Sequence, residues 1–222
     1  MMDVLKAADG HRLDCWIEPA KGVALGGVVI LQELFGVTDQ LQGVARHYAA
    51  QGYNVAIPAL FDRQDKGAVI SFDTPLVGRD LMLASDLENT LQDIEAAVQK
   101  LSSMGGKVAV IGFCWGGGLA LRAAQKLDIA GAISFYGTRL THYLDAPLKA
   151  PFQGHFGLSD DHTPPEVLEQ LKARFPEAEV HMYPAGHAFA NDARPSFVAD
   201  AAALAHQRSA AFLKAHVAEK SG

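Results

Sequence analysis

Cysteine is scarce in this sequence, and the two cysteines are far apart. Cys15 and Cys114 stand 99 positions from each other and form no CxxC pair. A disulfide scaffold or a thiolate zinc site needs several cysteines at short spacing, so the sequence argues against both kinds of protein. Each cysteine therefore needs an explanation of its own.

Long hydrophobic runs are also missing. The longest uncharged, mostly apolar run covers residues 108–121, which is 14 residues, whereas a membrane-spanning helix needs roughly 18 or more. The N-terminus carries Asp3 and Asp9 where a secretory signal would have a basic start and an apolar segment. We therefore expect no transmembrane helix and a cytoplasmic protein.

The charged residues form no block of one sign. The 25 acidic and 19 basic side chains give a formal net charge of −6. Because nucleic acids and anionic membranes bind basic patches, we expect neither of them as a partner. An anionic small molecule would need a local arginine to bind it.

Apolar residues are abundant, at 49% of the 222 residues. A chain with that composition can fill a hydrophobic core, which excludes a disordered protein. Domains usually contain ~100–200 residues, so the length fits one domain or at most two small ones. We expect a single domain over residues 1–222.

Short apolar segments predict the strands. Arg12–Glu18 alternates apolar and polar residues, which is typical of a half-buried edge strand. Later segments are short and nearly all apolar, as in strands that helices cover on both faces. These segments are residues 28–31, 55–57, 108–111, 130–135 and 151–157, and 179–183 adds one more strand.

Helical patterns lie between these strands. They cover residues 41–48, ended by Gly52, and residues 87–101, 116–126, 165–174 and 197–216. The alternation predicts an α/β protein with a mostly parallel central sheet and helices on both faces. Ligands of such sheets bind at the carboxyl ends of the strands. Residues 59–79 have a weak pattern and are expected to form a functional loop over the site.

The strongest local motif is the glycine-rich run 112–118, which directly follows an apolar strand and precedes a helical pattern. It has the form of a nucleophile elbow with Cys114 in the place of serine, and Gly112 and Gly116 would permit the sharp turn. The helix N-terminus would favour a negative charge on the sulfur. The alternatives are a buried structural cysteine and a dinucleotide loop, although the full GxGxxG spacing is absent.

A cysteine nucleophile needs a base and an acid that orients it, which in this fold follow in the order nucleophile, acid, histidine. Asp160 follows an apolar strand, and His187 follows the next strand. Asp161 and His162 are adjacent alternatives, but the sequence favours solvated loop positions for both. We therefore predict Asp160 as the acid and His187 as the base.

Three motifs of this sequence belong together: the segments 32–37 (QELFGV), 112–117 (GFCWGG) and 186–189 (GHAF). In combination they resemble the dienelactone hydrolase family, also called carboxymethylenebutenolidases, within the α/β-hydrolase superfamily. The resemblance covers nearly the whole chain, and further similar segments are 51–53, 134–137 and the C-terminal helix.

The resemblance implies a role for each of several residues. The catalytic triad would be Cys114, Asp160 and His187. Glu33 would be the carboxylate that holds or releases the thiol, although it also reads as an ordinary carboxylate at a strand end. The backbone N–H groups of Leu34 and Trp115 would form the oxyanion hole.

The resemblance is weaker at the positions that would bind the substrate. Family members that open dienelactone hold its carboxylate with two arginines. Arg79 is the candidate for the first, with Arg63 or a solvent-exposed role for Arg79 as alternatives, and the second position is Asn191 in this sequence. An apolar wall around a small ring, or simple core packing, is expected of Phe35, Trp115, Tyr136 and Phe189.

The resulting hypothesis is a hydrolase of a small lactone or ester, acting through an acyl-thioester on Cys114 and most readily opening dienelactone to maleylacetate. We expect no cofactor and no metal, since none of the nine histidines falls in a zinc-binding motif such as HExxH. We expect a monomer or a weak homodimer. The alternatives are a carboxylesterase or lactonase with another small substrate, and a non-catalytic relative that binds a ligand or senses oxidants.

Overall fold

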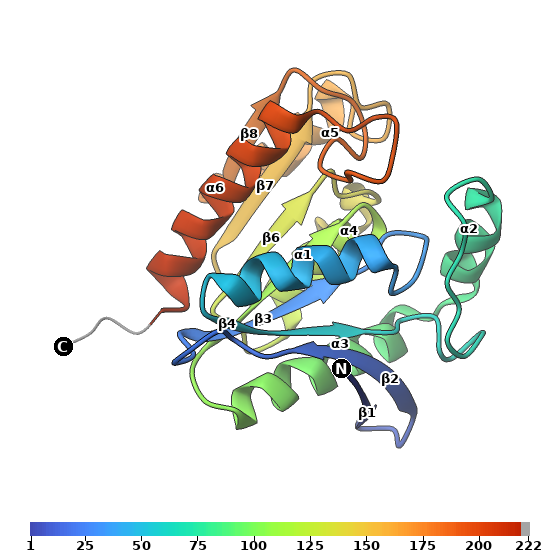
Figure 1. Ribbon diagram of the computed structural model, residues 1–222. Helices are drawn as coiled ribbons and strands as arrows, with labels where there is room; N and C mark the ends of the chain where they lie inside the picture. The colour runs from blue at the N-terminus through green and yellow to red at the C-terminus, as the bar shows by residue number, and fades with distance from the viewer. Residues whose placement is uncertain (219–222) are drawn as a thin grey trace. The chain divides into compact units, whose positions relative to one another are not determined.

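The computed structural model describes residues 1–218, and the chain divides into two compact units. Of the described residues, the first unit contains Met1–Ala109 with Val217 and Ala218, and the second contains Val110–His216. Strands and helices alternate along most of the chain (Figure 1). The predicted alternation of strands and helices is therefore confirmed. The expectation of a single domain over residues 1–222 stays a prediction.

Four strands form the sheet of the first unit, in the order β1 (Met2–Lys6), β2 (Arg12–Glu18), β4 (Tyr53–Pro58) and β3 (Gly26–Leu31). β2 is antiparallel to both of its neighbours, and β3 and β4 are parallel. Every residue of β3 and β4 is buried, because helices cover both faces.

The prediction of an edge strand at β2 was wrong, while the prediction of a half-buried strand is confirmed. β1 pairs with β2 along its full length and was missed by the sequence analysis. The reason is that β1 has only one buried residue, Leu5, and so shows no apolar alternation. In β2, the inward-facing residues are buried: Leu13, Cys15 and Ile17.

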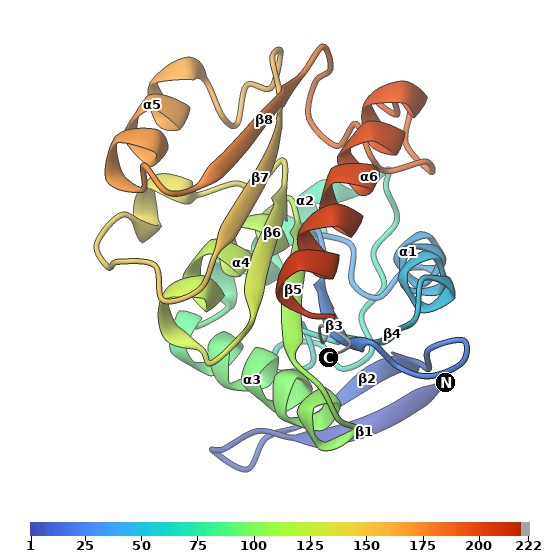
Figure 2. The same cartoon turned by 90° about the vertical axis from the view of Figure 1, so that its left-hand side faces the viewer.

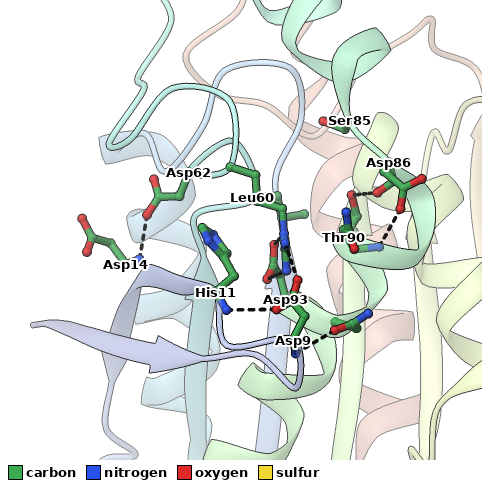
Figure 3. Close-up of polar contacts among 12 residues, drawn as sticks. Asp9, His11, Asp14, Leu60, Asp62, Ser85, Asp86, Thr90 and Asp93 are labelled. Atoms are coloured by element: carbon green, nitrogen blue, oxygen red, sulfur yellow. Dashed lines mark hydrogen bonds and ion pairs between the residues drawn. The ribbon is translucent and has the colours of Figure 1, made fainter.

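Two amphipathic helices, α1 (Asp39–Ala50) and α3 (Leu87–Ser103), lie on opposite faces of this sheet (Figure 2). Each begins at a side chain that accepts a backbone N–H of the first turn. Thr38 caps α1 at the Leu41 amide. Asp86, which is labelled in Figure 3, caps α3 at the Asn89 amide.

The expected functional loop over residues 59–79 is partly helical, which corrects the prediction. Its last part belongs to α2 (Pro75–Ala84). The pattern was missed because α2 buries one residue, Gly78, and has no apolar stripe that faces a core. Three of its apolar side chains are exposed, Leu76, Val77 and Leu83, and two more, Leu81 and Met82, are only half-buried.

The first part of the same loop is fixed by buried carboxylates. Asp62 accepts the amides of Asp14 and Gly67, each at 2.7 Å; the Asp14 bond is drawn in Figure 3. Arg63 binds Asp93 of α3 through two nitrogens, at 2.7 and 2.8 Å, and Asp9 through a third, at 2.6 Å. Arg63 therefore connects the loop to α3 and to the β1–β2 turn.

Removing the Arg63 guanidinium is expected to destabilise the protein. The Asp93 side chain is 1% exposed, so Arg63→Ala leaves a buried carboxylate without its charged partner, at a cost of about 3 kcal/mol in the free energy of unfolding. Denaturant unfolding measures this. Arg79→Ala is the matched control, because the Arg79–Asp80 pair is exposed and should contribute less than about 1 kcal/mol. Equal stabilities of the two variants would contradict the prediction.

The second unit contains most of β5 and all of β6 to β8, in sequential order, and the β6–β7 and β7–β8 pairs are parallel. Helices α4 and α5 lie on one face and α6 on the other (Figure 2). The strands are β5 (Val108–Phe113), β6 (Gly131–Phe135), β7 (Phe152–Gly157) and β8 (Glu179–Tyr183). The helices are α4 (Trp115–Lys126), the short 3-10 helix η1 (Leu140–Tyr143), α5 (Pro165–Arg174) and α6 (Ala199–His216).

A buried polar network joins β7, β8 and α6. The His155 ring is fully buried, with Nδ1 2.7 Å from the Tyr183 hydroxyl and Nε2 2.9 Å from the side-chain oxygen Oε1 of Gln153. Arg208 of α6 donates to the same Tyr183 hydroxyl at 3.1 Å. These contacts satisfy the buried groups, and burial lowers the pKa of His155 well below its usual value.

Among residues 1–218, none of the helices has both the length and the apolar character that a membrane-spanning helix needs.

Candidate active site

Cys114 occupies the turn between β5 and α4, in a backbone conformation that is unusual for a residue with a side chain. Its φ is 53° and its ψ is −114°. Its amide donates to the Phe135 carbonyl, and its own carbonyl accepts the amides of Gly117 and Thr138, all at 3.0 Å. These hydrogen bonds hold a strained turn in place, as a nucleophile elbow requires.

The glycines around Cys114 are needed for close backbone approach. A Cβ atom on Gly112 would overlap the Gly116 carbonyl and lie 2.7 Å from the Gly117 nitrogen. A Cβ atom on Gly117 would lie 2.6 Å from the Gly137 Cα. The predicted role of Gly112 in permitting the turn is therefore confirmed.

Asp160 lies in the loop after β7 and binds the ring of His187, which lies in the loop after β8. The Nδ1–Oδ2 distance is 2.8 Å, and the side chains are 18% (His187) and 0% (Asp160) exposed. The other Asp160 oxygen accepts the His162 amide at 2.9 Å. Burial raises the pKa of Asp160, but the hydrogen bonds from His187 and the His162 amide outweigh it, so the pKa is lowered.

The same contacts determine the charge of His187. Burial lowers its pKa, but the interactions with Asp160 and then Cys114 prevail and raise the pKa to about 10. Nε2 of His187 is buried and has no nitrogen or oxygen hydrogen-bond partner among the described residues. The ring thus lies between a carboxylate and a sulfur, and both groups favour its protonated form.

This raised pKa predicts a pH-dependent stability. Because the folded protein binds the His187 proton more tightly than the unfolded chain, the stabilisation is complete below about pH 6.5 and is lost as the pH rises to about 10. The slope is at most about 1.4 kcal/mol per pH unit. Urea unfolding between pH 6 and 10 measures it, with His187→Gln as the reference. Parallel curves for the two proteins would contradict the prediction.

An aromatic ring, that of Tyr136, packs against His187. The Tyr136 ring lies 5.2 Å from the His187 ring and 5.5 Å from the Phe189 ring. Tyr136 and Ala188 have φ values of 39° and 60°. Besides Arg139, the described non-glycine residues with positive φ are therefore at Cys114, Tyr136 and beside His187, and such strain often marks functional sites.

His162 is the residue that sequence reasoning undervalued. It is exposed, but its ring lies 4.4 Å from the His187 ring. The signal was its position two residues after Asp160, where an aspartate side chain commonly accepts the backbone amide. Asp161 is exposed, and the contact with His187 is made by Asp160, as predicted.

Glu33 and Leu34 follow β3 in the first unit. Glu33 is buried and Leu34 is half-buried. Phe35, also buried, packs edge-on against Phe72 with ring centroids 4.7 Å apart. The roles that the family resemblance implies for Glu33 and Leu34 remain predictions, as does that of Trp115, the first residue of α4.

The candidate substrate-binding residues have different environments. Arg79 is exposed on α2 and binds its neighbour Asp80 at 3.0 Å. Arg63 is engaged by two carboxylates, which argues against it as the substrate arginine. Asn191 is buried, and its side-chain oxygen accepts the Ala193 amide at 3.1 Å.

The remaining cysteine has no sign of reactivity. Cys15 is fully buried in β2, and burial raises the pKa of its thiol to about 12. Among residues 1–218, no three histidine, cysteine or acidic side chains form a group that could hold a metal ion.

Known proteins resemble this chain over most of its length. The model of the "Dienelactone hydrolase family" matches residues 15–217. The carboxymethylenebutenolidase of Pseudomonas putida is 32% identical over 222 residues, and the match covers 94% of each chain. A "Putative carboxymethylenebutenolidase" of Yersinia pestis is 35% identical over 200 residues, which cover 82% of this chain and 74% of that protein.

A solved structure agrees with these sequence matches. The crystal structure titled "Putative Dienelactone Hydrolase" from Klebsiella pneumoniae superposes with a TM-score of 0.81 at 25% identity, covering 95% of this chain and 97% of that one. The matches confirm the fold class predicted from the sequence, an α/β-hydrolase fold with a mostly parallel sheet and helices on both faces.

Proposed function

Because the chain belongs to the dienelactone hydrolase family, we propose that it opens small lactones, dienelactone to maleylacetate foremost, with a triad of Cys114, His187 and Asp160. Membership of this family, with carboxymethylenebutenolidases among its relatives, identifies the protein as a carboxylic ester hydrolase. The observation that carries the proposal is the environment of the His187 ring. Its Nδ1 lies 2.8 Å from the Asp160 carboxylate, and Asp160 and Cys114 both raise its pKa. A nucleophile, a base and an orienting acid are related in this way in acyl transfer.

The reaction proceeds in two steps. In the first, the Cys114 sulfur bonds to the substrate carbonyl carbon, and His187 carries the thiol proton to the ring oxygen as the C–O bond breaks. In the second step, water attacks the thioester while His187 takes a proton from the water. That proton then goes to the departing sulfur, which restores the thiol and releases the acid.

The negative charge that forms on the carbonyl oxygen requires hydrogen-bond donors. We assign these to the backbone amides of Trp115 and Leu34, the first at the N-terminus of α4 and the second after β3. Glu33 would control the thiol before substrate binds. These assignments rest on the match of the segments 32–37 and 112–117 to the family motifs.

The preference for dienelactone rests on binding of its carboxylate. Arg79 supports this, because its guanidinium is exposed and its partner Asp80 is a solvated neighbour that a substrate carboxylate would replace at small cost. Asn191 favours the second candidate, a lactonase or carboxylesterase with a neutral substrate, since it supplies no positive charge.

A substrate panel tests the proposal. Purified protein would be assayed with dienelactone isomers, neutral lactones of the same ring size and short aryl esters. We expect the highest kcat/KM for dienelactone, and a rise in KM for the anionic substrates alone in the Arg79→Gln variant. Higher kcat/KM on neutral lactones would favour the second candidate. Ligand binding without turnover of any substrate would contradict an enzymatic function.

A further inference from the structure

Helix α2 contacts the rest of the first unit through a glycine. Gly78 is the one residue of this ten-residue helix that is buried. A Cβ atom at Gly78 would overlap the Leu34 carbonyl oxygen and lie 2.8 Å from the Leu34 carbonyl carbon. The backbone of α2 therefore rests directly on the backbone of Leu34.

The covering segment, which we define as residues 68–84, also holds the two residues after Leu34. The Ile70 amide donates to the Phe35 carbonyl at 2.9 Å, and Phe72 packs on the Phe35 ring. Gly36 pairs with Val69 in an isolated bridge, at a φ of 78°. Three successive residues, 34 to 36, are thus fixed from one side by a single segment.

We propose that Gly78 is a positioning residue for the reaction: by letting α2 rest on Leu34, it sets the orientation of the Leu34 amide that donates to the oxyanion. This rests on the proposed function, which assigns that donor. The amide of Leu34 and the carbonyl that α2 covers belong to the two peptide groups joined at the Leu34 Cα. Because the covering segment also holds residues 35 and 36, we expect a displaced Leu34 carbonyl to be taken up by rotation about φ and ψ of Leu34, which reorients its amide. Oxyanion donors act through fixed placement, so a small displacement reduces transition-state stabilisation.

No side chain of α2 is fully buried, so the backbone contact at Gly78 is its closest attachment. Leu76, Val77 and Leu83 are exposed and two other apolar residues of α2 are half-buried, and the Thr74 side chain makes no cap at the helix N-terminus. For Gly78→Ala, helix propensity and the backbone contact predict opposite effects on the stability of α2. Alanine favours an isolated helix over glycine, whereas the contact with Leu34 requires the added methyl group to displace one of the two backbones.

The test compares two reactions of the Cys114 thiol in the Gly78→Ala protein. Ester hydrolysis needs the oxyanion donors, whereas alkylation by iodoacetamide occurs at a saturated carbon and forms no oxyanion. We expect kcat for an aryl ester to fall at least tenfold with a KM change of less than threefold. The alkylation rate of Cys114 should stay within twofold of the wild type.

Gly43→Ala is the matched control. Gly43 lies in α1 of the same unit, and the nearest atom to its added Cβ is the flexible Arg46 Nη2, at 3.8 Å. That variant should keep both rates, and its melting temperature should stay the same or rise, because alanine favours the helix. An unchanged kcat in Gly78→Ala, or an equal loss of hydrolysis and alkylation, would overturn the proposal. Ester turnover that survives Cys114→Ala in the wild-type background would instead refute the proposed function.

Discussion

Cys114→Ala is expected to lower kcat/KM for lactones and esters by about 10⁴-fold or more, because no other group replaces the nucleophile and the covalent route is lost. The fold should persist, since the turn is held by backbone hydrogen bonds to Phe135 and from Gly117 and Thr138. Initial rates on the preferred substrate, with a thermal melt of each protein, measure the effect.

Cys15→Ala is the control for loss of a thiol. Cys15 lies in β2, is fully buried, and has a thiol pKa raised to about 12, so its removal should leave kcat within twofold of the wild type. A Cys114→Ala protein with wild-type rates, or a Cys15→Ala protein that is inactive although folded, would contradict the assignment of the nucleophile.

Asp160→Asn is expected to lower kcat by about 10³-fold or more. The amide keeps the shape of the side chain but removes the charge that orients and stabilises the protonated His187 ring. The pKa of His187 should fall at the same time, because Asp160 is the largest of the groups that raise it. Steady-state kinetics and NMR titration of the His187 ring measure the two effects.

Asp161→Asn separates the role of Asp160 from a general effect of charge in this loop. Asp161 is the adjacent residue and is exposed, so its replacement should change kcat less than threefold. If Asp160→Asn retained more than about a tenth of the wild-type kcat, or if the His187 pKa did not change, Asp160 would not be the orienting acid.

The sequence predicted the second unit more accurately than the first. β8 and α5 lie where their patterns indicated, and α4 begins one residue earlier. Buried parallel strands are nearly all apolar and the covering helices have an apolar stripe, so both leave a clear pattern. The order of Cys114, Asp160 and His187 followed from their positions after strands, and the structure places the acid against the base.

Elements that bury little were not predictable. β1 has one buried residue and α2 has one buried glycine, so neither shows an apolar periodicity. The contact of His162 with His187 depends on how one aspartate side chain bonds a backbone amide, and sequence spacing only hints at that. The role of Arg63 was open in the sequence for a similar reason, because its carboxylate partners come from distant positions, Asp9 and Asp93.

The central claim is that the Cys114 sulfur carries the acyl group during turnover, and trapping that intermediate tests it most directly. Acid quenching during hydrolysis of a slow ester, followed by peptide mass spectrometry, should show the acyl mass on the peptide that contains Cys114. The adduct should persist in Cys15→Ala and be absent in Cys114→Ala. An acyl group on another residue, or turnover that continues without an adduct in Cys114→Ala, would contradict the account.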